Sequence, residues 1–366
     1  PYGTMGQGGN AYEWMESELD GINNDPSAFR ALRGGEWAQA ISAMASTARN
    51  ASSPNGTLDS FSFRVAGNPN AFPVTTSYVS IGDSNNAADT DIGNYGAVSN
   101  DYKIGKFEVT EKEIDAYNLS SLNAGKQITI SNRGENKPAT NITWLECARF
   151  ANWLSINEGH QPAYNFSDDS ITTVNSLWPV SDSWSASNRF RHKDTKYFLP
   201  SEDEWYKAAY YDPDKDVTGG YYIYPTGSDV APTAVSTGTG PETAVYDGQS
   251  DVSDVFTSGG LSPYGTMAQG GNAYEWLESS TDGLNDGLDN TRVLRGGAYD
   301  DLPNDPGEEQ WLRKDTRFTS YTISDEGQNV SFRMAMNPEK DTPTVFYDTN
   351  IDVIATYSGN IPFEYN

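Results

Sequence analysis

The sequence predicts an α+β protein that is rich in loops, with two main helices and short antiparallel strands. Two segments begin with a helix-capping pattern and continue with apolar residues at helical spacing. Short runs of β-branched and aromatic residues, typical of strands, surround them. The 366 residues include 34 glycines and 19 prolines, and both residue types interrupt regular structure, so much of the chain is expected to form ordered loops.

The two helices are expected to begin at Thr143 and Ser201. A glutamate follows each of them three positions later, Glu146 and Glu204, which completes a capping box. The second helix should end before Pro213, because proline cannot continue a helix. The apolar face of the first helix consists of Trp144, Cys147, Ala148, Ala151 and Leu154.

Strands are expected at residues 102–109 and 127–130 and within the run SFRMAM at 331–336. The segment TVFYDTNIDVIATY near the C-terminus is also rich in β-branched and aromatic residues. It predicts one or two further strands.

An internal repeat determines the expected domain organisation. Residues 1–37, which start PYGTMGQGGNAYEWMES, align without a gap with residues 263–299, which start PYGTMAQGGNAYEWLES. Both copies later close on Ser-Phe-Arg. Only the second copy has a long segment before it. We therefore expect a C-terminal third of a first unit at 1–67, a linker at 68–77, a complete unit at 78–338 and a strand-rich tail at 339–366.

A third of a unit cannot bury its own hydrophobic face, so residues 1–67 are expected to pair with another structure. Two candidates remain open at this stage. One is the N-terminal part of a first unit in a longer chain. The other is a neighbouring subunit, which would contribute by swapping or by strand donation.

The formal net charge of −27 argues against nucleic-acid binding, which needs clustered basic residues, and against anionic membrane surfaces. The acidity indicates either solubility in an extracellular setting or cation binding. A single cysteine rules out an intrachain disulfide, and no apolar run is long enough to span a membrane. The two histidines, His160 and His192, are expected at the surface and are too few for a catalytic triad or a histidine-rich metal site.

The order of several motifs resembles that of the formylglycine-generating enzyme, or sulfatase-modifying factor, family. These motifs are FEVT at 107–110, PATNITW at 138–144, LPSEDEW at 199–205, YPTG at 224–227, GNAYEW at 271–276, LRGG at 294–297 and FR at 332–333. The resemblance implies a variant of the C-type lectin fold. The runs YKIGKFEVT and LPSEDEWYKAAYYDP are similar to a secreted bacterial branch of the family, which implies an extracellular or cell-surface location.

Members of this family that make formylglycine use two cysteines in the C-terminal third to hold copper, which suits a soft thiolate pair. This chain has no cysteine between Arg295 and Phe332, and none between Arg33 and Phe63 in the partial copy. The lone Cys147 lies on the apolar face of the first helix, where we expect a buried structural thiol. The resemblance therefore implies a pseudoenzyme without catalytic residues.

The resemblance also implies a structural Ca²⁺ at the GNAYEW loop, held by backbone carbonyls and one glutamate. The residues carried over are Gly271, Ala273 and Glu275 in the complete copy and Gly9, Ala11 and Glu13 in the partial copy. The family's additional side-chain ligand, three residues before the glycine, is replaced by Ala268 or Gly6, neither of which has a side-chain oxygen. The alternative is that Glu275 only hydrogen-bonds the loop.

Three functions remain open. The favoured one is a non-catalytic extracellular structural protein that self-associates into a filament or layer. The alternative is a lectin-like binding module for glycan or protein ligands, in which tyrosines at 210–211 and 221–224 stack on sugars or instead pack in the core. The third is an enzyme of unfamiliar chemistry.

Overall fold

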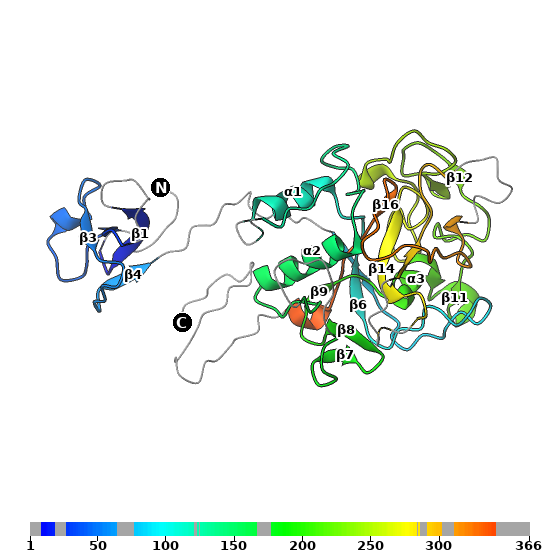
Figure 1. Cartoon of the computed structure of the whole chain (residues 1–366), viewed down its shortest axis with the longest axis horizontal. Helices are drawn as coiled ribbons and strands as arrows, with labels where there is room; N and C mark the ends of the chain where they lie inside the picture. Colours follow the sequence, from blue (N-terminus) through cyan, green and yellow to red (C-terminus); the bar gives the residue numbers. More distant parts are fainter. Residues whose placement is uncertain are drawn as a thin grey trace. The chain divides into compact units, whose positions relative to one another are not determined.

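The structure is a computed structural model, and it divides the chain into two compact units, Pro1–Phe72 and Pro73–Asn366 (Figure 1). It describes residues 9–18, 27–63, 77–120, 123, 125–166, 177–283, 285, 291–301 and 311–341. Apart from Ser77, the expected linker at 68–77 lies outside the described residues, and so do the strands expected in the C-terminal tail.

The first unit contains one four-stranded sheet with the strand order β3-β2-β1-β4 (Figure 1). Its elements are β1 (Tyr12–Glu18), β2 (Arg30–Arg33), the short 3-10 helix η1 (Ile41–Met44), β3 (Asn50–Ser52) and β4 (Phe61–Phe63). The central strand β1 pairs antiparallel with β2 and parallel with β4.

The second unit builds the same arrangement from β14 (Tyr274–Ser280), β15 (Arg292–Arg295) and β16 (Val330–Ser331). Here β14 pairs antiparallel with β15 and parallel with β16. The register is also the same, as these facing pairs show: Glu13–Arg33, Trp14–Leu32 and Glu18–Arg30 in the first unit, and Glu275–Arg295, Trp276–Leu294 and Ser280–Arg292 in the second. Both sheets have an irregularity after the tryptophan.

Three α-helices lie in the described part of the second unit: α1 (Glu111–Leu119), α2 (Trp144–Asn157) and α3 (Glu202–Tyr210). The predicted capping boxes of α2 and α3 are confirmed: Thr143 with Glu146, and Ser201 with Glu204. Helix α1 was not predicted, although Thr110 and Glu113 form a third capping box at its start. Figure 1 shows α2 close to β9 and α3 close to β14.

The remaining strands of the second unit are short. The sheet β5-β6-β17-β9 is antiparallel throughout, β7-β8 and β10-β11 are antiparallel hairpins, and β12-β13 is a parallel pair. Their bounds are β5 Tyr78–Ile81, β6 Tyr102–Gly105, β7 Ser183–Ser185, β8 Asn188–His192, β9 Tyr197–Phe198, β10 Tyr211–Asp212, β11 Gly220–Tyr221, β12 Thr233–Ala234, β13 Thr243–Ala244 and β17 Ala335–Met336. Short 3-10 helices lie at η3 Lys215–Val217, η4 Val255–Thr257 and η6 Pro338–Asp341.

The strand predictions are met in two places and wrong in one. Residues 102–109 contribute β6, and the run 331–336 contributes part of β16 and all of β17. Residues 127–130 form no strand. The Asn118 side chain instead accepts the backbone N–H of Ile128 at 2.7 Å and donates to its carbonyl at 2.9 Å, so the backbone of Ile128 is satisfied without a partner strand.

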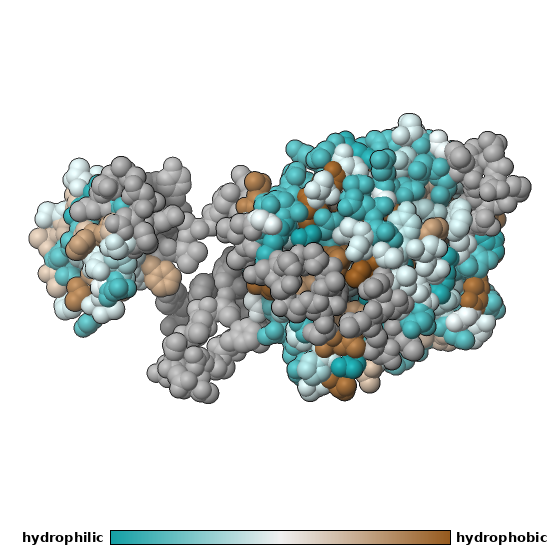
Figure 2. Space-filling model, viewed as in Figure 1, coloured by the Kyte–Doolittle hydropathy of each residue, from teal (hydrophilic) through white to brown (hydrophobic). Residues whose placement is uncertain are grey.

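The main core of the second unit forms around α2. Trp144, Phe150, Trp276 and Phe332 are completely buried in it, and Cys147 is buried as predicted. The face of this unit seen in Figure 2 is mostly hydrophilic, with hydrophobic residues in small groups. Among the described residues, no helix combines the length and apolar character that a membrane span requires. The predicted loop-rich α+β fold class is confirmed.

Candidate functional sites

The proposed calcium loop is held by the protein's own side chains. The Glu275 carboxylate is fully buried and forms a two-pronged ion pair with Arg333, with N–O distances of 2.5 Å from Nε to Oε2 and from Nη2 to Oε1. Trp205 of α3 donates its indole N–H to Glu275 Oε2 at 2.7 Å. Both carboxylate oxygens therefore already face a donor, and the nearest charge is positive.

The rest of this loop is equally tightly enclosed. Gly271 has a φ of +86°, and a Cβ there would lie 2.3 Å from the carbonyl oxygen of Val245, so only glycine fits. Asn272 donates its side-chain N–H groups to Glu108 at 3.0 and 3.1 Å. Burial, followed by the charge of Glu275, raises the pKa of Glu108 well above its usual range. Ala273 is completely buried.

In the first unit, Gly9 has a similar φ of +84°, Ala11 is half-buried and Glu13 is buried. In neither unit do the described residues contain a cluster of three or more His, Cys, Asp or Glu side chains that suits a metal. The Ca²⁺ assignment stays a prediction. At Glu275, Arg333 occupies the place that a cation would need, so the side chain as it stands does not fit as a calcium ligand.

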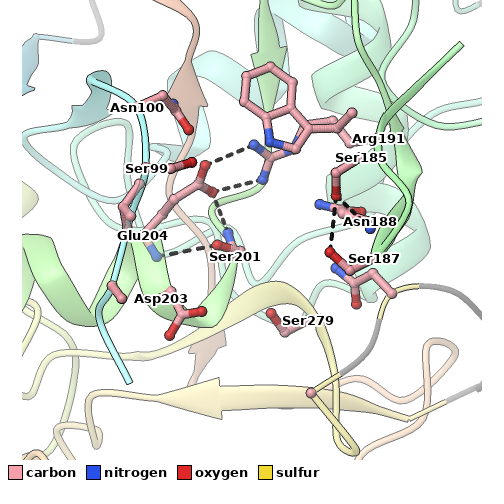
Figure 3. Close-up of a pocket in the computed structure, with 15 residues that line it drawn as sticks. Ser99, Asn100, Ser185, Ser187, Asn188, Arg191, Ser201, Asp203, Glu204 and Ser279 are labelled. Carbon is pink, nitrogen blue, oxygen red and sulfur yellow. Dashed lines mark hydrogen bonds and ion pairs between the residues drawn. The ribbon is translucent and has the colours of Figure 1, made fainter. Parts of the chain in front are cut away.

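The second candidate site is a polar pocket of about 230 Å³ in the complete unit (Figure 3). It lies between the start of α3, the β7–β8 hairpin, the loop at 97–100 and the end of β14. Its walls are mainly hydroxyl and amide groups, from Ser99, Asn100, Ser185, Ser187, Asn188, Ser201, Ser279 and Asn285. Such groups can both donate and accept hydrogen bonds, which suits a ligand rich in hydroxyls.

A buried charge network forms one wall of this pocket. Arg191 of β8 contacts Glu204 at 2.7 and 2.8 Å and Glu278 of β14 at 2.8 and 2.9 Å. Burial alone would raise the pKa of Glu204, but the Arg191 guanidinium and hydrogen bonds from Ser201 hold it below its usual range. Figure 3 shows Glu204 between Arg191 and Ser201. Glu204 therefore stays charged at neutral pH, and the network fixes α3, β8 and β14 relative to one another.

Two other side chains give the pocket its specific chemistry. Asp203 accepts a hydrogen bond from the backbone N–H of Gly96 at 2.8 Å, and burial raises its pKa from 3.8 to about 6. Trp184 is half-buried, with the Arg191 guanidinium 5.2 Å from its ring centroid. The pocket thus combines a titratable carboxylate with an aromatic ring.

The third candidate site is the face of the first unit that corresponds to buried positions in the complete unit. Phe63 is 71 % exposed, whereas its counterpart Phe332 is 0 % exposed. Trp37 is 78 % exposed and its counterpart Tyr299 is 8 % exposed. Hydrophobic residues are visible on the surface of the first unit in Figure 2. This set, with Trp14, is called the open face below.

Contacts in the complete unit show what covers the equivalent of Trp14, whereas Tyr299, the equivalent of Trp37, packs with Val245 and Val252 instead. Trp276 donates its indole N–H to the carbonyl of Ile142 just before α2, and Trp144 of α2 donates to the carbonyl of Leu277, both at 2.9 Å. Arg295 donates to Glu202 of α3 at 2.8 Å. In the complete unit, α2 and α3 of the same chain therefore cover the sheet that β14 and β15 form.

Other sequence predictions concern possible catalytic groups. Burial, followed by the nearby charge of Glu146, raises the pKa of the Cys147 thiol well above its usual range, which fits an inert structural cysteine. The surface prediction is wrong for His192, which is buried with its ring 4.6 Å from that of Trp178. Burial lowers the pKa of His192, and its Nδ1 accepts the backbone N–H of Asp194.

Comparison with known proteins identifies the family. The model of the sulfatase-modifying factor enzyme 1-like domain matches residues 1–69 and 78–338, which is most of the chain. The chain belongs to this family. The predicted resemblance is thereby confirmed, and both copies of the repeat carry sulfatase-modifying factor sequence. A sequence search of curated proteins gave no match.

Several solved structures are similar to this sulfatase-modifying factor protein. Treponema denticola variable protein 1 is 20% identical, with 71% of this chain and 95% of that chain covered and a TM-score of 0.46. CarF is 19% identical, with 71% and 98% covered and a TM-score of 0.48. PvdO from Pseudomonas aeruginosa is 17% identical, with 71% and 93% covered and a TM-score of 0.42. These likenesses do not assign a function.

Proposed function

We propose that this chain is a non-catalytic extracellular structural protein that assembles through the open face of its first unit. The observation that carries the proposal is the contrast between Phe63, 71 % exposed, and Phe332, 0 % exposed, at equivalent positions. A core position left in water makes an exposed apolar patch, and such patches mark interaction surfaces. The acidic composition and the absence of a second cysteine agree with a role other than the family's thiol chemistry.

The occupant of the open face has the chemistry of α2 and α3: two helices that offer tryptophan rings and a glutamate. Another copy of the chain carries such helices. Its own segment from Pro263 occupies them, but the sheet of the first unit has the same strand register, with Trp14 facing Leu32 as Trp276 faces Leu294. The shared register supports exchange between copies.

This exchange is heterologous, because the first unit of one copy meets the second unit of the next. A heterologous contact that does not close into a ring grows into an open filament. When the first unit of one copy displaces the C-terminal third of a second copy, that displaced segment can in turn bind α2 and α3 of a third copy. This proposal explains why a partial repeat retains the register of the complete unit.

Particle size in solution tests the proposal. We expect particles larger than the 40.0 kDa monomer by light scattering, and elongated particles by negative-stain microscopy. The variant Phe63→Ser should shift the population toward monomer. Val217→Ser changes a 96 % exposed residue of the second unit and serves as the matched control. A strictly monomeric chain, or equal assembly by both variants, would contradict the proposal.

A second candidate function, glycan binding, is favoured by the polar pocket of Figure 3. Its combination of the Trp184 ring with hydroxyl, amide and carboxylate groups suits a sugar, which offers both apolar C–H faces and hydroxyls. Of the tyrosines first considered for this role, Tyr210, Tyr211 and Tyr224 are buried, whereas Tyr221 and Tyr222 are half-buried.

A glycan array tests this second candidate. Bound glycans should be lost with Trp184→Ala and kept with Trp178→Phe, which changes a tryptophan outside the pocket lining. If the parent chain binds no glycan, or if Trp184→Ala binds glycans as well as the parent chain does, the pocket is not a glycan site.

A further inference from the structure

A separate cavity of about 280 Å³ lies in the C-terminal third of the complete unit. Four aromatic side chains, with Asp301 and Asn329, form most of its lining: Tyr274, Trp311, Phe318 and Tyr321. It shares no lining residue with the polar pocket. Leu294 and Val330, from the strands that flank β14, also line it. We call this cavity the aromatic pocket.

The four rings stand at steep angles to one another. Tyr274 lies 6.3 Å from Trp311 at an interplanar angle of 77°, and Trp311 lies 6.2 Å from Phe318 at 54°. Phe318 lies 5.4 Å from Tyr321 at 70°. None of these pairs is stacked face to face: Tyr274–Trp311 and Phe318–Tyr321 are edge-to-face contacts, and Trp311–Phe318 is tilted. Each ring is half-buried, which fixes it while part of it still borders the cavity.

A carboxylate accompanies the rings. Tyr274 donates its hydroxyl to Asp301, at 3.2 and 3.3 Å to the two oxygens, and the backbone N–H of Ala298 donates to Asp301 at 2.8 Å. Burial, then the charge of Asp301, raises the pKa of Tyr274 well above its usual range, so its hydroxyl stays protonated. Asp300 is held close by the side-chain N–H of Asn329 at 3.0 Å.

Among the residues that the structure describes, no Lys or Arg side chain lines the aromatic pocket. Their cation–π contacts involve other rings, for example Arg133 over Tyr299 and Arg313 over Tyr224. The aromatic pocket therefore offers negative ring faces beside the Asp301 carboxylate, and no cation–π contact within the described residues involves these four rings.

We propose that the aromatic pocket binds an organic cation of the methylated ammonium class. Ring faces attract a cation electrostatically, and several rings at steep angles form the kind of cage that surrounds a quaternary ammonium group. A primary ammonium has three N–H donors that need acceptors; Asp301 and Asn329 can accept hydrogen bonds, but the four rings that form most of the lining supply no strong acceptor from their carbons. A trimethylammonium group has no N–H and covers its charge with methyl groups, so it loses less hydration on entering such a cage.

The size of the pocket agrees with a small group of this kind. Pockets for drug-sized ligands begin at about 300 Å³, so about 280 Å³ accommodates a headgroup rather than a large molecule. This proposal does not depend on assembly through the first unit, because every lining residue belongs to the complete unit.

Isothermal titration of the full chain with choline tests the proposal, with 3,3-dimethyl-1-butanol as a neutral probe of the same shape. Choline should bind about ten-fold more tightly than the neutral probe, the size of effect expected for a desolvated cation–π contact. Trp311→Ala should weaken choline binding by about ten-fold or more, and Asp301→Asn by a few-fold with a smaller salt dependence. Trp184→Ala, in the polar pocket, is the matched control and should leave choline binding unchanged.

Equal binding of choline and the neutral probe would overturn the proposal, since it would leave only an apolar cavity. The same holds if choline fails to bind in the millimolar range, or if Trp311→Ala binds it as the parent chain does. Trp311→Phe guards against misfolding: it keeps a ring in place and should retain most of the affinity.

Discussion

The guanidinium of Arg333 and the carboxylate of Glu275 meet in a two-pronged ion pair with neither side chain accessible to water. Arg333 follows the last strand of the repeated sheet, and Glu275 lies on its central strand. Arg333 also donates to the carbonyls of Gly105 and Met267 at 2.9 Å. The pair thus ties the C-terminal third to β6 and to the loop that precedes β14.

Replacing one partner of this pair should strongly destabilise the protein. Arg333→Met leaves the Glu275 carboxylate buried without its counter-charge, and the expected loss is about 3–5 kcal/mol in the free energy of unfolding. Urea denaturation followed by tryptophan fluorescence measures it. Arg313→Met removes a partly exposed pair with Asp315 and should cost no more than about 1 kcal/mol. An equal loss of unfolding free energy in the two variants would show that the buried pair stabilises the protein no more than the exposed pair does.

Removal of calcium should change little if Arg333 serves as the counter-charge at Glu275. We expect the Tm of the full chain to be the same in EDTA and in excess Ca²⁺, because a ligand that binds only the folded state raises Tm with its concentration. Differential scanning calorimetry makes the comparison, with Mg²⁺ as the control ion. A clear rise specific to Ca²⁺ would restore the calcium site that the family resemblance implies.

Equivalent phenylalanines in the two units should respond differently to truncation. Phe332→Ala removes a wholly buried ring that contacts Phe150, and should cost about 3–5 kcal/mol. Phe63→Ala removes an exposed ring and should change the stability of the dilute chain by less than about 0.5 kcal/mol. Chemical denaturation at low protein concentration gives both values. A large loss for Phe63→Ala under these conditions would mean that the first unit buries this ring within one chain.

Asp203 should make stability depend on pH in a defined direction. Its pKa in the folded protein is about 6, above the usual 3.8, so the folded state holds the proton more tightly than the unfolded state. The cost of burying the charged form is absent below about pH 4, grows between about pH 4 and 6, and is complete above. Asp203→Asn should therefore stabilise the protein near pH 7, by at most about 3 kcal/mol, and not near pH 4.

Urea unfolding of the parent and variant at the two pH values provides the comparison. Asp214→Asn changes an exposed acid on another loop and is the control. A stabilisation by Asp203→Asn that persists unchanged at the lower pH would rule out this carboxylate as the cause.

The helices were predictable where two local signals coincide. Thr143 and Ser201 each start a capping box, and apolar residues at helical spacing follow, so α2 and α3 could be placed from the sequence. Helix α1 has the same capping box but offers only Ile114 and Tyr117 as buried hydrophobic residues, which makes its apolar face too short to recognise. Its position depends on packing of Tyr117 against Phe150 and Trp153 of α2.

The pockets could not be predicted because their walls come from distant segments. Trp184, Asp203 and Asn285 line one pocket, yet nothing in their local sequence relates them. The aromatic pocket likewise combines Tyr274 of β14 with rings more than thirty positions later. Glu275 illustrates the same limit for charge: its motif is visible in the sequence, but Glu275 lies on strand β14 rather than in a loop, and its partner Arg333 becomes evident only in the folded chain.

The shared register of the two sheets has an evolutionary consequence. Strands β1 and β2 pair as β14 and β15 do, including the irregularity after the tryptophan, although the described residues of the first unit supply no counterpart of α2 or α3. The information for this pairing therefore lies within the short segment itself. A genetic recombination event that copied only this segment would transfer a strand arrangement that still forms correctly at its new location.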